Sequence, residues 1–505
     1  MPAIRDLVQA AEGGALLAEA ALRKEVHRML AADEAGRVEI DRFLRAATPR
    51  RWVTFDESMR AYWYGERPAA QDHWWRRVLR AATPRDARSG DLLALGLASM
   101  DRVGHTREEA IRHLAKEADP LVGPFLALRT TDWVEQVSSL AVTALADRVR
   151  SDRAVLIAAA PLLFTLSDRR RTSNLEDLVL ERAAGDPETL AALLAVPDTR
   201  TRRRVIGNQS ARTAMTVEQL VELARSDTDT VVATTAGIDA VLRAVATDAS
   251  TDVLTSLMTG PALVRRAVLG ALAERAQGLS VAERYLFDRS PGVRAAAQLV
   301  YRQAGHDPAL VYRAALDQSD HVPVAITELA MIGTNADHER VLGALQAEDV
   351  ATRRAAANAV RWVAADRLRD LLTPLLWDPS AGVTRTAVRR LQAKASELDS
   401  AMLFELATAP LTHNRRAAYR LIRRRTAAER VEANLIALAD EDELIRRDAV
   451  ADLRSWLHGG AASAPRADLP TRRRMSQRLD SLEHELRRDD IERLRFHAGL
   501  RPQDL

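Results

Sequence analysis

The sequence contains no cysteine. Disulfide bonds, thiolate nucleophiles, cysteine-ligated zinc and cysteine-held iron–sulfur clusters are therefore excluded. Aromatic residues make up only 4% of the 505 residues, whereas alanine, leucine and arginine are abundant. This balance favours helices over sheets. A chain of this length also exceeds one simple globule.

Lysine is almost as scarce, since it occurs only at Lys24, Lys116 and Lys394. Arginine therefore supplies nearly all of the 73 basic residues, and the 70 acidic residues leave a formal net charge of +3. A GC-rich genome would produce this bias without any functional cause. Arginine also pairs in planar forks with carboxylates and phosphates. The position of each arginine is therefore more informative than the total.

An apolar run long enough to cross a bilayer is also missing. The longest, Ala154 to Leu166, has thirteen residues and contains Pro161. Residues 1–30 carry acids and bases throughout and lack the apolar core and cleavage site of a signal peptide. We therefore expect a cytoplasmic protein that does not bind membranes.

Motifs that identify common enzymes do not occur. The sequence has no G-x-x-x-x-G-K-[ST], no G-x-G-x-x-G after a strand, no G-x-S-x-G elbow and no H-E-x-x-H. The histidines are scattered, and His105 and His113 would lie about 80° apart around a helix. Carboxylates alternate with arginines, which makes each an ion-pair partner first. We expect no metal, no cofactor and no catalytic residue.

A repeat of about thirty-one residues is the main feature that is present. Each repeat has an acid and turn residues, then an anchor that is usually aliphatic, then a small residue four positions later. Successive anchors are 29 to 32 residues apart. They are Thr106, Val137, Arg169, Thr201, Val232, Val264, Val293, Val322, Thr352, Val383, Asn414 and Ile445.

The positions that follow each anchor have the character of a buried helix face. Every residue at position +4 is small or aliphatic, and most at +8 are apolar, with Asp177 and Gln209 as exceptions. These positions share one stripe with the anchor. Upstream acids such as Asp132, Asp227 and Asp378 lie where a helix cap or a turn is expected. Further helices fill the intervals, so each repeat is a helix pair.

This pattern resembles the HEAT-repeat family, especially the short bacterial form that is similar to phycobilin-lyase-type repeats. The resemblance covers about residues 90–458, and residues 200–238 also resemble leucine-rich variant repeats. It implies an all-α fold, a right-handed α-solenoid of about twelve helix pairs with a period near 31 residues. The carrying residues are the anchor, the small residue at +4 and the arginine at +1, which is Arg265, Arg294, Arg353, Arg415 or Arg446.

The chain outside the repeats divides into three segments. Residues 1–90 contain an aromatic cluster, which includes Trp52, Trp63, Trp74 and Trp75. The cluster is either a stacking or peptide-binding site or the packed N-terminal cap of the array, which spans 91–458. Residues 459–470 form a linker rich in glycine and alanine. An amphipathic helix over 471–498 either docks on the last repeat as a C-terminal cap, which is the expectation, or pairs with another chain.

Arginines also recur two positions after the anchor, nearly opposite the apolar stripe, so stacked repeats would align them in an outward ridge. The ridge comprises Arg171, Arg203, Arg266, Arg354, Arg385, Arg416 and Arg447. The ridge is either a site for an anionic partner or a ladder of ion pairs to acids such as Asp349, Asp442, Glu443 and Asp448. The arginines at +1 are expected to form a structural ladder.

The sequence is compatible with three functions. The first is a non-enzymatic scaffold that binds a protein or peptide along its helices. The second is nucleic-acid binding through the arginine ridge, although the near-neutral charge disfavours it. The third is an enzyme, because some HEAT-like proteins are similar to alkylated-base glycosylases or bilin lyases. Asp56, Glu57 and Asp72, near the tryptophans, would be its candidate carboxylates.

Overall fold

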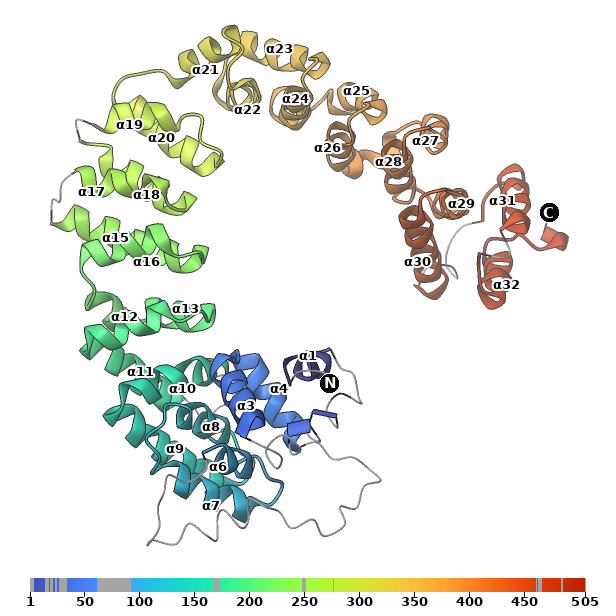
Figure 1. Cartoon of the computed structure of the whole chain (residues 1–505). Helices are drawn as coiled ribbons and strands as arrows, with labels where there is room; N and C mark the ends of the chain where they lie inside the picture. Colours follow the sequence, from blue (N-terminus) through green and yellow to red (C-terminus); the bar gives the residue numbers. More distant parts are fainter. Residues whose placement is uncertain are drawn as a thin grey trace, which may run out of the picture. The chain divides into compact units, whose positions relative to one another are not determined.

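The computed structural model describes residues 4–13, 18, 21–22, 25–26, 34–60, 92–166, 173–247, 251–275, 277–459, 461, 466–482 and 485–504. The regular secondary structure of these residues is entirely helical (Figure 1). The chain divides into two compact units, Met1–Val281 and Ala282–Leu505. Each unit is built from stacked pairs of helices, so the fold is the all-α solenoid that the repeat predicts.

In the described residues, the first unit begins with helices that precede the repeats, and the repeats follow. Its helices are α1 (Ile4–Glu12), α3 (Glu34–Ala46), α4 (Pro49–Arg60), α6 (Leu92–Ala98), α7 (Gly104–Leu114), α8 (Val122–Arg129), α9 (Glu135–Ser151), α10 (Arg153–Leu166), α11 (Ser173–Gly185), α12 (Pro187–Ala195), α13 (Thr199–Gly207), α14 (Gln209–Thr213), α15 (Val217–Ser226), α16 (Thr230–Ala246), α17 (Thr251–Ser256), η1 (Leu257–Thr259) and α18 (Ala262–Leu272). The division between the units falls within α19 (Gly278–Tyr285).

The second unit continues the pattern and ends with two helices outside it. Its elements are α20 (Pro291–Gln303), α21 (Pro308–Asp317), α22 (Val322–Ile332), α23 (Asn335–Gly343), η2 (Ala344–Gln346), α24 (Val350–Val363), α25 (Leu368–Leu372), η3 (Pro374–Trp377), α26 (Ala381–Leu391), η4 (Gln392–Glu397), α27 (Ser400–Leu406), α28 (Thr412–Ile422), α29 (Ala427–Leu438), α30 (Glu443–Gly459), α31 (Leu469–Ser481), α32 (Arg488–His497) and η6 (Pro502–Asp504).

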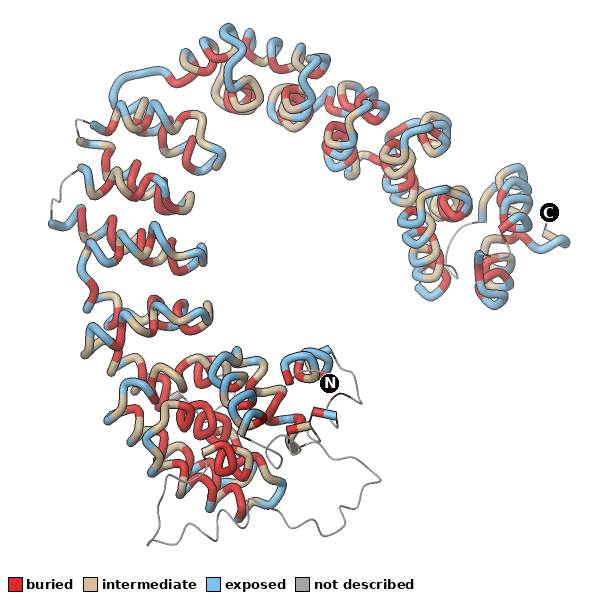
Figure 2. The backbone as a smooth tube through the Cα atoms, in the orientation of Figure 1, coloured by how far each residue is buried: buried red, intermediate tan, exposed pale blue. Residues whose placement is uncertain are grey.

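The predicted anchors lie on one helix of each pair. These helices, called anchor helices below, are α7, α9, α13, α16 and α18 in the first unit and α20, α22, α24, α26, α28 and α30 in the second. Of the anchors in the described residues, Val322 is half-buried and all the others are buried. Arg169 lies outside the described residues. Buried residues gather where neighbouring helices meet within each unit (Figure 2).

The small residues at position +4 explain how closely the anchor helices stack. All of them within the described residues whose exposure is given are buried, from Ala110 to Ala449. Within the second unit, α22, α24, α26 and α28 contact one another in succession. Gln209, an exception at +8, is exposed because Asn208 ends α13 and caps the new helix α14, accepting a 2.9 Å hydrogen bond from the Ala211 amide.

The C-terminal segment differs from the sequence prediction. One helix was expected over 471–498, but the structure has α31 and α32, with the first ending at Ser481 and the second beginning at Arg488. The apolar stripe was misleading because Leu482 and Leu486 are buried although they lie between the helices. Helix α31 contacts α29, and α32 contacts α30.

In the parts of the chain that the structure describes, no helix joins the length and the apolar composition that a bilayer crossing needs.

Candidate functional site

The arginines at position +1 clamp consecutive repeats together. In four repeats the guanidinium donates from Nε and Nη2 to an aspartate 25 residues later, at distances of 2.8–3.3 Å. The pairs are Arg107–Asp132, Arg202–Asp227, Arg353–Asp378 and Arg415–Asp440. This is the structural ladder that the sequence predicts for the +1 position.

Each clamp also organises the backbone around it. The Nη1 group of each of these arginines donates to the two carbonyls five and six residues before it, as Arg353 does to Ala347 and Glu348 at 2.8 Å. The receiving aspartate accepts from the amide two residues on, as Asp378 does from Ser380 at 2.7 Å. One side-chain pair therefore fixes the turn before its own helix and the turn before the next.

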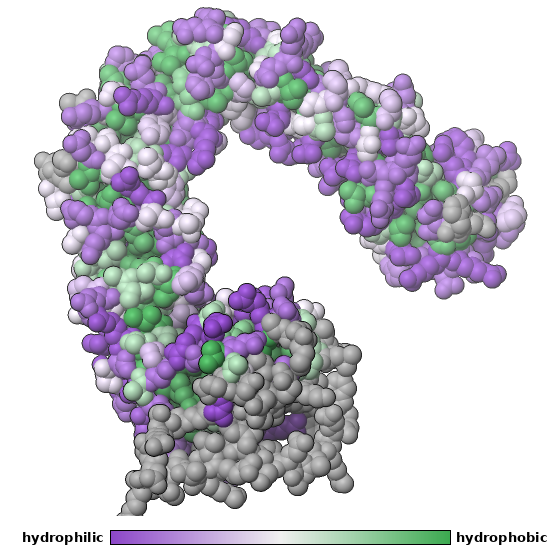
Figure 3. Space-filling model, viewed as in Figure 1, coloured by the Kyte–Doolittle hydropathy of each residue, from purple (hydrophilic) through white to green (hydrophobic). Residues whose placement is uncertain are grey.

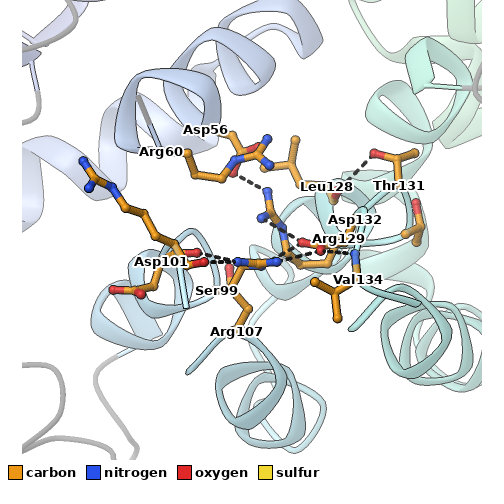
Figure 4. Close-up of polar contacts among 12 residues, drawn as sticks. Asp56, Arg60, Ser99, Asp101, Arg107, Leu128, Arg129, Thr131, Asp132 and Val134 are labelled. Atoms are coloured by element: carbon orange, nitrogen blue, oxygen red, sulfur yellow. Dashed lines mark hydrogen bonds and ion pairs between the residues drawn. The ribbon is translucent and has the colours of Figure 1, made fainter. Parts of the chain in front are cut away.

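In the first unit, a buried network surrounds one clamp (Figure 4). The Arg107 and Asp132 side chains are fully shielded from solvent. Arg129 pairs with Asp132 at 3.5 Å and with Asp56 of α4, which also pairs with Arg60. Burial lowers the pKa of Arg129, while the Asp56 carboxylate opposes that shift. The network fastens α4 to the first repeats.

The same network gives Asp56 a structural role. Asp56 is only 2% exposed and its two oxygens are engaged by arginines. Trp52 is buried and packs edge-on against Phe125 of α8, with ring centroids 5.1 Å apart. Neither side chain presents a free surface in this structure. Trp63, Trp74, Trp75 and Asp72 lie outside the described residues, and Glu57 is exposed on α4.

Sequence reasoning missed an exposed tryptophan beside this network. Trp133 is 63% exposed, and the guanidinium carbons of Arg107 and Arg60 lie 4.4 and 5.1 Å from its ring centroid. Cations at this distance from an indole face are attracted to it. The sequence feature that could have identified Trp133 is its position directly after Asp132, the aspartate of the clamp.

The +2 arginines fall into two groups. Arg203 and Arg416 pair with the aspartates that precede the next anchor helix, Asp229 at 2.7 Å and Asp442 at 2.8 Å. Hydrogen bonds from Arg203 lower the pKa of Asp229 to about 2, outweighing its partial burial. These two arginines form the ladder that was the alternative to ligand binding. Arg171 lies outside the described residues.

The other four +2 arginines are exposed: Arg266, Arg354, Arg385 and Arg447. Among the described residues, no carboxylate lies within ion-pairing distance of any of the four. Three of them, on α24, α26 and α30, belong to the second unit. Their guanidinium groups therefore face water.

Exposed apolar side chains share the helix face of these arginines. Positions −1, +2, +6, +9, +10 and +13 relative to the anchor fall within an arc of about 100°, called the outward face below. In the first unit it carries Val231, Leu242, Val245 and Leu263; in the second it carries Leu299, Met331, Trp362 and Leu444. Figure 3 shows hydrophobic side chains lying between hydrophilic ones on the surface of both units.

Three further arginines gather where α24 and α26 meet: Arg361 and Arg389 lie on the outward face, and Arg390, at position +7, is half-buried beside it. Arg389 and Arg390 both donate from Nη2 to the amide oxygen of Asn358, at 3.1 and 3.0 Å. Arg361 is close enough to Arg390 to lower its pKa, after the larger effect of burial. We call Arg361, Arg389 and Arg390 the arginine cluster. These three positions were not predicted from the sequence.

Comparison with known proteins finds only distant likenesses. No family model matches the chain, and no curated protein matches it. Among solved structures, it is similar to yeast importin-beta (Kap95p), at 13% identity and a TM-score of 0.38, over 95% of this chain and 67% of that one. A mutant of Kap121p gives 14% identity and a TM-score of 0.29, over 96% and 61%. The chain thus spans about three fifths of Kap121p, and the likeness concerns stacked helices alone.

Proposed function

We propose that this protein is a non-enzymatic scaffold that binds a protein or peptide along the outward face of its anchor helices. The observation that carries this proposal is the mixture of side chains on that face. Leu242 of α16 is 63% exposed, Met331 of α22 is 46% exposed and Trp362 of α24 is 40% exposed. Uncovered arginines lie on the same face of the neighbouring repeats.

This mixture suits a protein partner. Tryptophan, methionine and arginine are enriched where proteins contact each other, because they combine apolar area with directional polar contacts. Apolar side chains that recur on one face of successive helices can bury area that would otherwise stay in water. Repeat arrays use such extended surfaces to bind partners. The resemblance to short bacterial HEAT repeats is compatible with this role.

Nucleic-acid binding is the second candidate, and the exposed arginines of α24 and α26 are the observation in its favour. Carboxylates weaken it, since Asp229 neutralises Arg203 in the first unit and Asp442 neutralises Arg416 in the second. Each of these acids would repel a phosphate backbone that follows the arginines of its own unit. An enzymatic role has less support, because Asp56 is held inside a buried ion-pair network.

Site-specific photo-crosslinking tests the proposal. A photoreactive amino acid placed at Leu242 samples the outward face of α16 in the full chain. The same residue placed at Glu222, exposed on α15, samples the other helix layer of that repeat. We expect nuclease-resistant crosslinks to one protein from position 242 and none from position 222 after irradiation in the native cytoplasm.

The two alternatives give different results in the same experiment. Crosslinks that disappear after nuclease treatment would replace a protein partner with a nucleic acid. Equal crosslinking from positions 222 and 242, or none from either, would contradict an outward-face scaffold.

A further inference from the structure

The arginine cluster lies where α24 and α26 pack side by side within the second unit. Asn358 projects from α24 at position +6, and Arg389 holds the same position on α26. One amide oxygen accepts hydrogen bonds from two guanidinium groups there. A neutral amide cannot compensate two positive charges, so the site keeps an excess of positive charge.

The surroundings of Arg390 support this conclusion. Its Nε atom is buried and has no hydrogen-bond partner. Burial and repulsion from Arg361 and Arg389 lower its pKa, and no carboxylate acts against that shift. Within the described residues, the cluster forms no ion pair, whereas Arg353 on the same helix has Asp378. Like charges held together at a partly buried site indicate a place for an anion.

The neighbours of the cluster narrow the class of anion. The guanidinium carbon of Arg361 lies over the indole of Trp362, 4.0 Å from the ring centroid, where a cation is attracted to the ring. Arg354 and Arg385, uncovered at position +2, lie one to two turns away on the same two helices. Trp362 itself is exposed on the same face. The site therefore joins several cationic forks to an aromatic surface.

We propose that the arginine cluster binds the carboxylates of an acidic peptide segment whose apolar side chains pack on Trp362. This inference rests on the proposed scaffold function and adds the chemistry of the partner. Planar guanidinium groups match carboxylates in paired hydrogen bonds. An apolar residue within the acidic segment would cover the indole. The positive charges supply selection for acidic sequences.

Binding of a synthetic peptide tests the proposal directly. The probe is a fluorescein-labelled peptide of repeating Glu-Leu-Glu-Glu sequence, followed by fluorescence anisotropy with the full chain. We expect saturable binding, and an affinity about tenfold lower for the double variant R389A/R390A, because charge-assisted hydrogen bonds are lost. A peptide of repeating Gln-Leu-Gln-Gln sequence should not bind.

The matched control removes the same charge elsewhere. R367A/R369A deletes two exposed arginines at α25, in the other helix layer of the same unit. Its affinity for the acidic peptide should stay within about twofold of the unmodified chain, because only long-range attraction changes. If both double variants lost the same affinity for the acidic peptide, the cluster would contribute only through the net charge of the protein, and the proposal would be overturned.

A second variant separates binding from folding. N358D places a carboxylate where the amide oxygen now accepts from Arg389 and Arg390, so the protein supplies its own anion. We expect a higher melting temperature together with an affinity about tenfold lower for the peptide. A higher melting temperature with unchanged peptide affinity would show that the cluster does not bind carboxylates.

The outcomes also distinguish this inference from the proposed function. If oligothymidylate binds more tightly than the acidic peptide and loses affinity in R389A/R390A, the cluster serves nucleic acid and the peptide proposal fails. If neither probe binds but position 242 still crosslinks to a protein, the scaffold stands and the acidic-peptide inference fails.

Discussion

Arg107 and Asp132 form a two-pronged ion pair between consecutive repeats, with donor–acceptor distances of 2.8 Å and both side chains fully shielded from solvent. Arg107 is a residue of α7, and Asp132 lies in the turn before α9. Three other repeats use the same 25-residue spacing. Polar bonds therefore reinforce the apolar stacking at the boundary between repeats.

Removal of this arginine should strongly destabilise the first unit. R107A leaves the buried Asp132 carboxylate with a weaker partner, so we expect the free energy of unfolding to fall by about 3–5 kcal/mol. Urea denaturation followed by circular dichroism measures the change. R150A removes an exposed arginine paired with Asp147 and should cost less than about 1 kcal/mol. Similar losses in the two variants would contradict a buried clamp.

A glycine controls the distance between two anchor helices. A Cβ atom at Gly237 of α16 would lie 2.6 Å from Cγ2 of Val264 on α18. G237A should therefore lower stability by about 1–3 kcal/mol through overpacking. Gly270 of α18 is exposed and has open space, so G270A should raise stability by about 0.5–1 kcal/mol. Thermal unfolding of both variants compares the two; the same sign for both would refute the close contact.

The pairing of Arg203 with Asp229 predicts a dependence of stability on acid. The pKa of Asp229 falls from 3.8 to about 2 in the folded chain. Because the folded state binds this proton less readily, the contribution is fully present above about pH 4 and is lost as the pH falls through 2. The stability difference between the unmodified chain and R203A should therefore shrink on acidification. A difference independent of pH would show that the pair contributes nothing.

An exposed tryptophan should contribute to peptide binding without contributing to folding. W362A is expected to weaken binding of the Glu-Leu-Glu-Glu peptide by about tenfold and to leave the melting temperature nearly unchanged. Trp377, which is 38% exposed in η3 against 40% for Trp362, offers a matched control on the other layer. Its replacement by alanine should not affect the peptide. Equal effects would place the peptide elsewhere.

Most of the fold could be predicted because the signal recurs. The anchor and the small residue at +4 recur along the chain, so a repeat that matches this pattern weakly is still recognised from its spacing to the neighbouring repeats. Arg353 and Arg415 form the structural ladder that was expected of the +1 arginines, whereas Arg294 pairs with Glu328 instead of an aspartate 25 residues later. Asn208 shows the limit, since one helix-capping side chain interrupts a predicted helix face.

The candidate site was predictable only in part. The +2 column identifies outward positions, but which arginines are neutralised depends on the acid that the next repeat presents, as Asp229 does for Arg203. The arginines of the cluster lie at positions +6, +7 and +9 relative to their anchors, so they do not recur at one position of the repeat. Aligning position +6 of adjacent repeats would have brought Asn358 and Arg389 together. Trp133 follows no repeated pattern.

The 25-residue spacing also bears on how such an array can change in length. The two halves of a joint come from consecutive repeats: Arg353 follows the anchor Thr352, and Asp378 precedes the next anchor, Val383. Thr384 follows Val383, so that repeat carries only the aspartate half. A duplication of both repeats would supply Arg353-like and Asp378-like groups in register, whereas a duplication of either repeat alone would leave one charge without its partner. This part of the array can therefore be lengthened with its joints intact only by a pair of repeats.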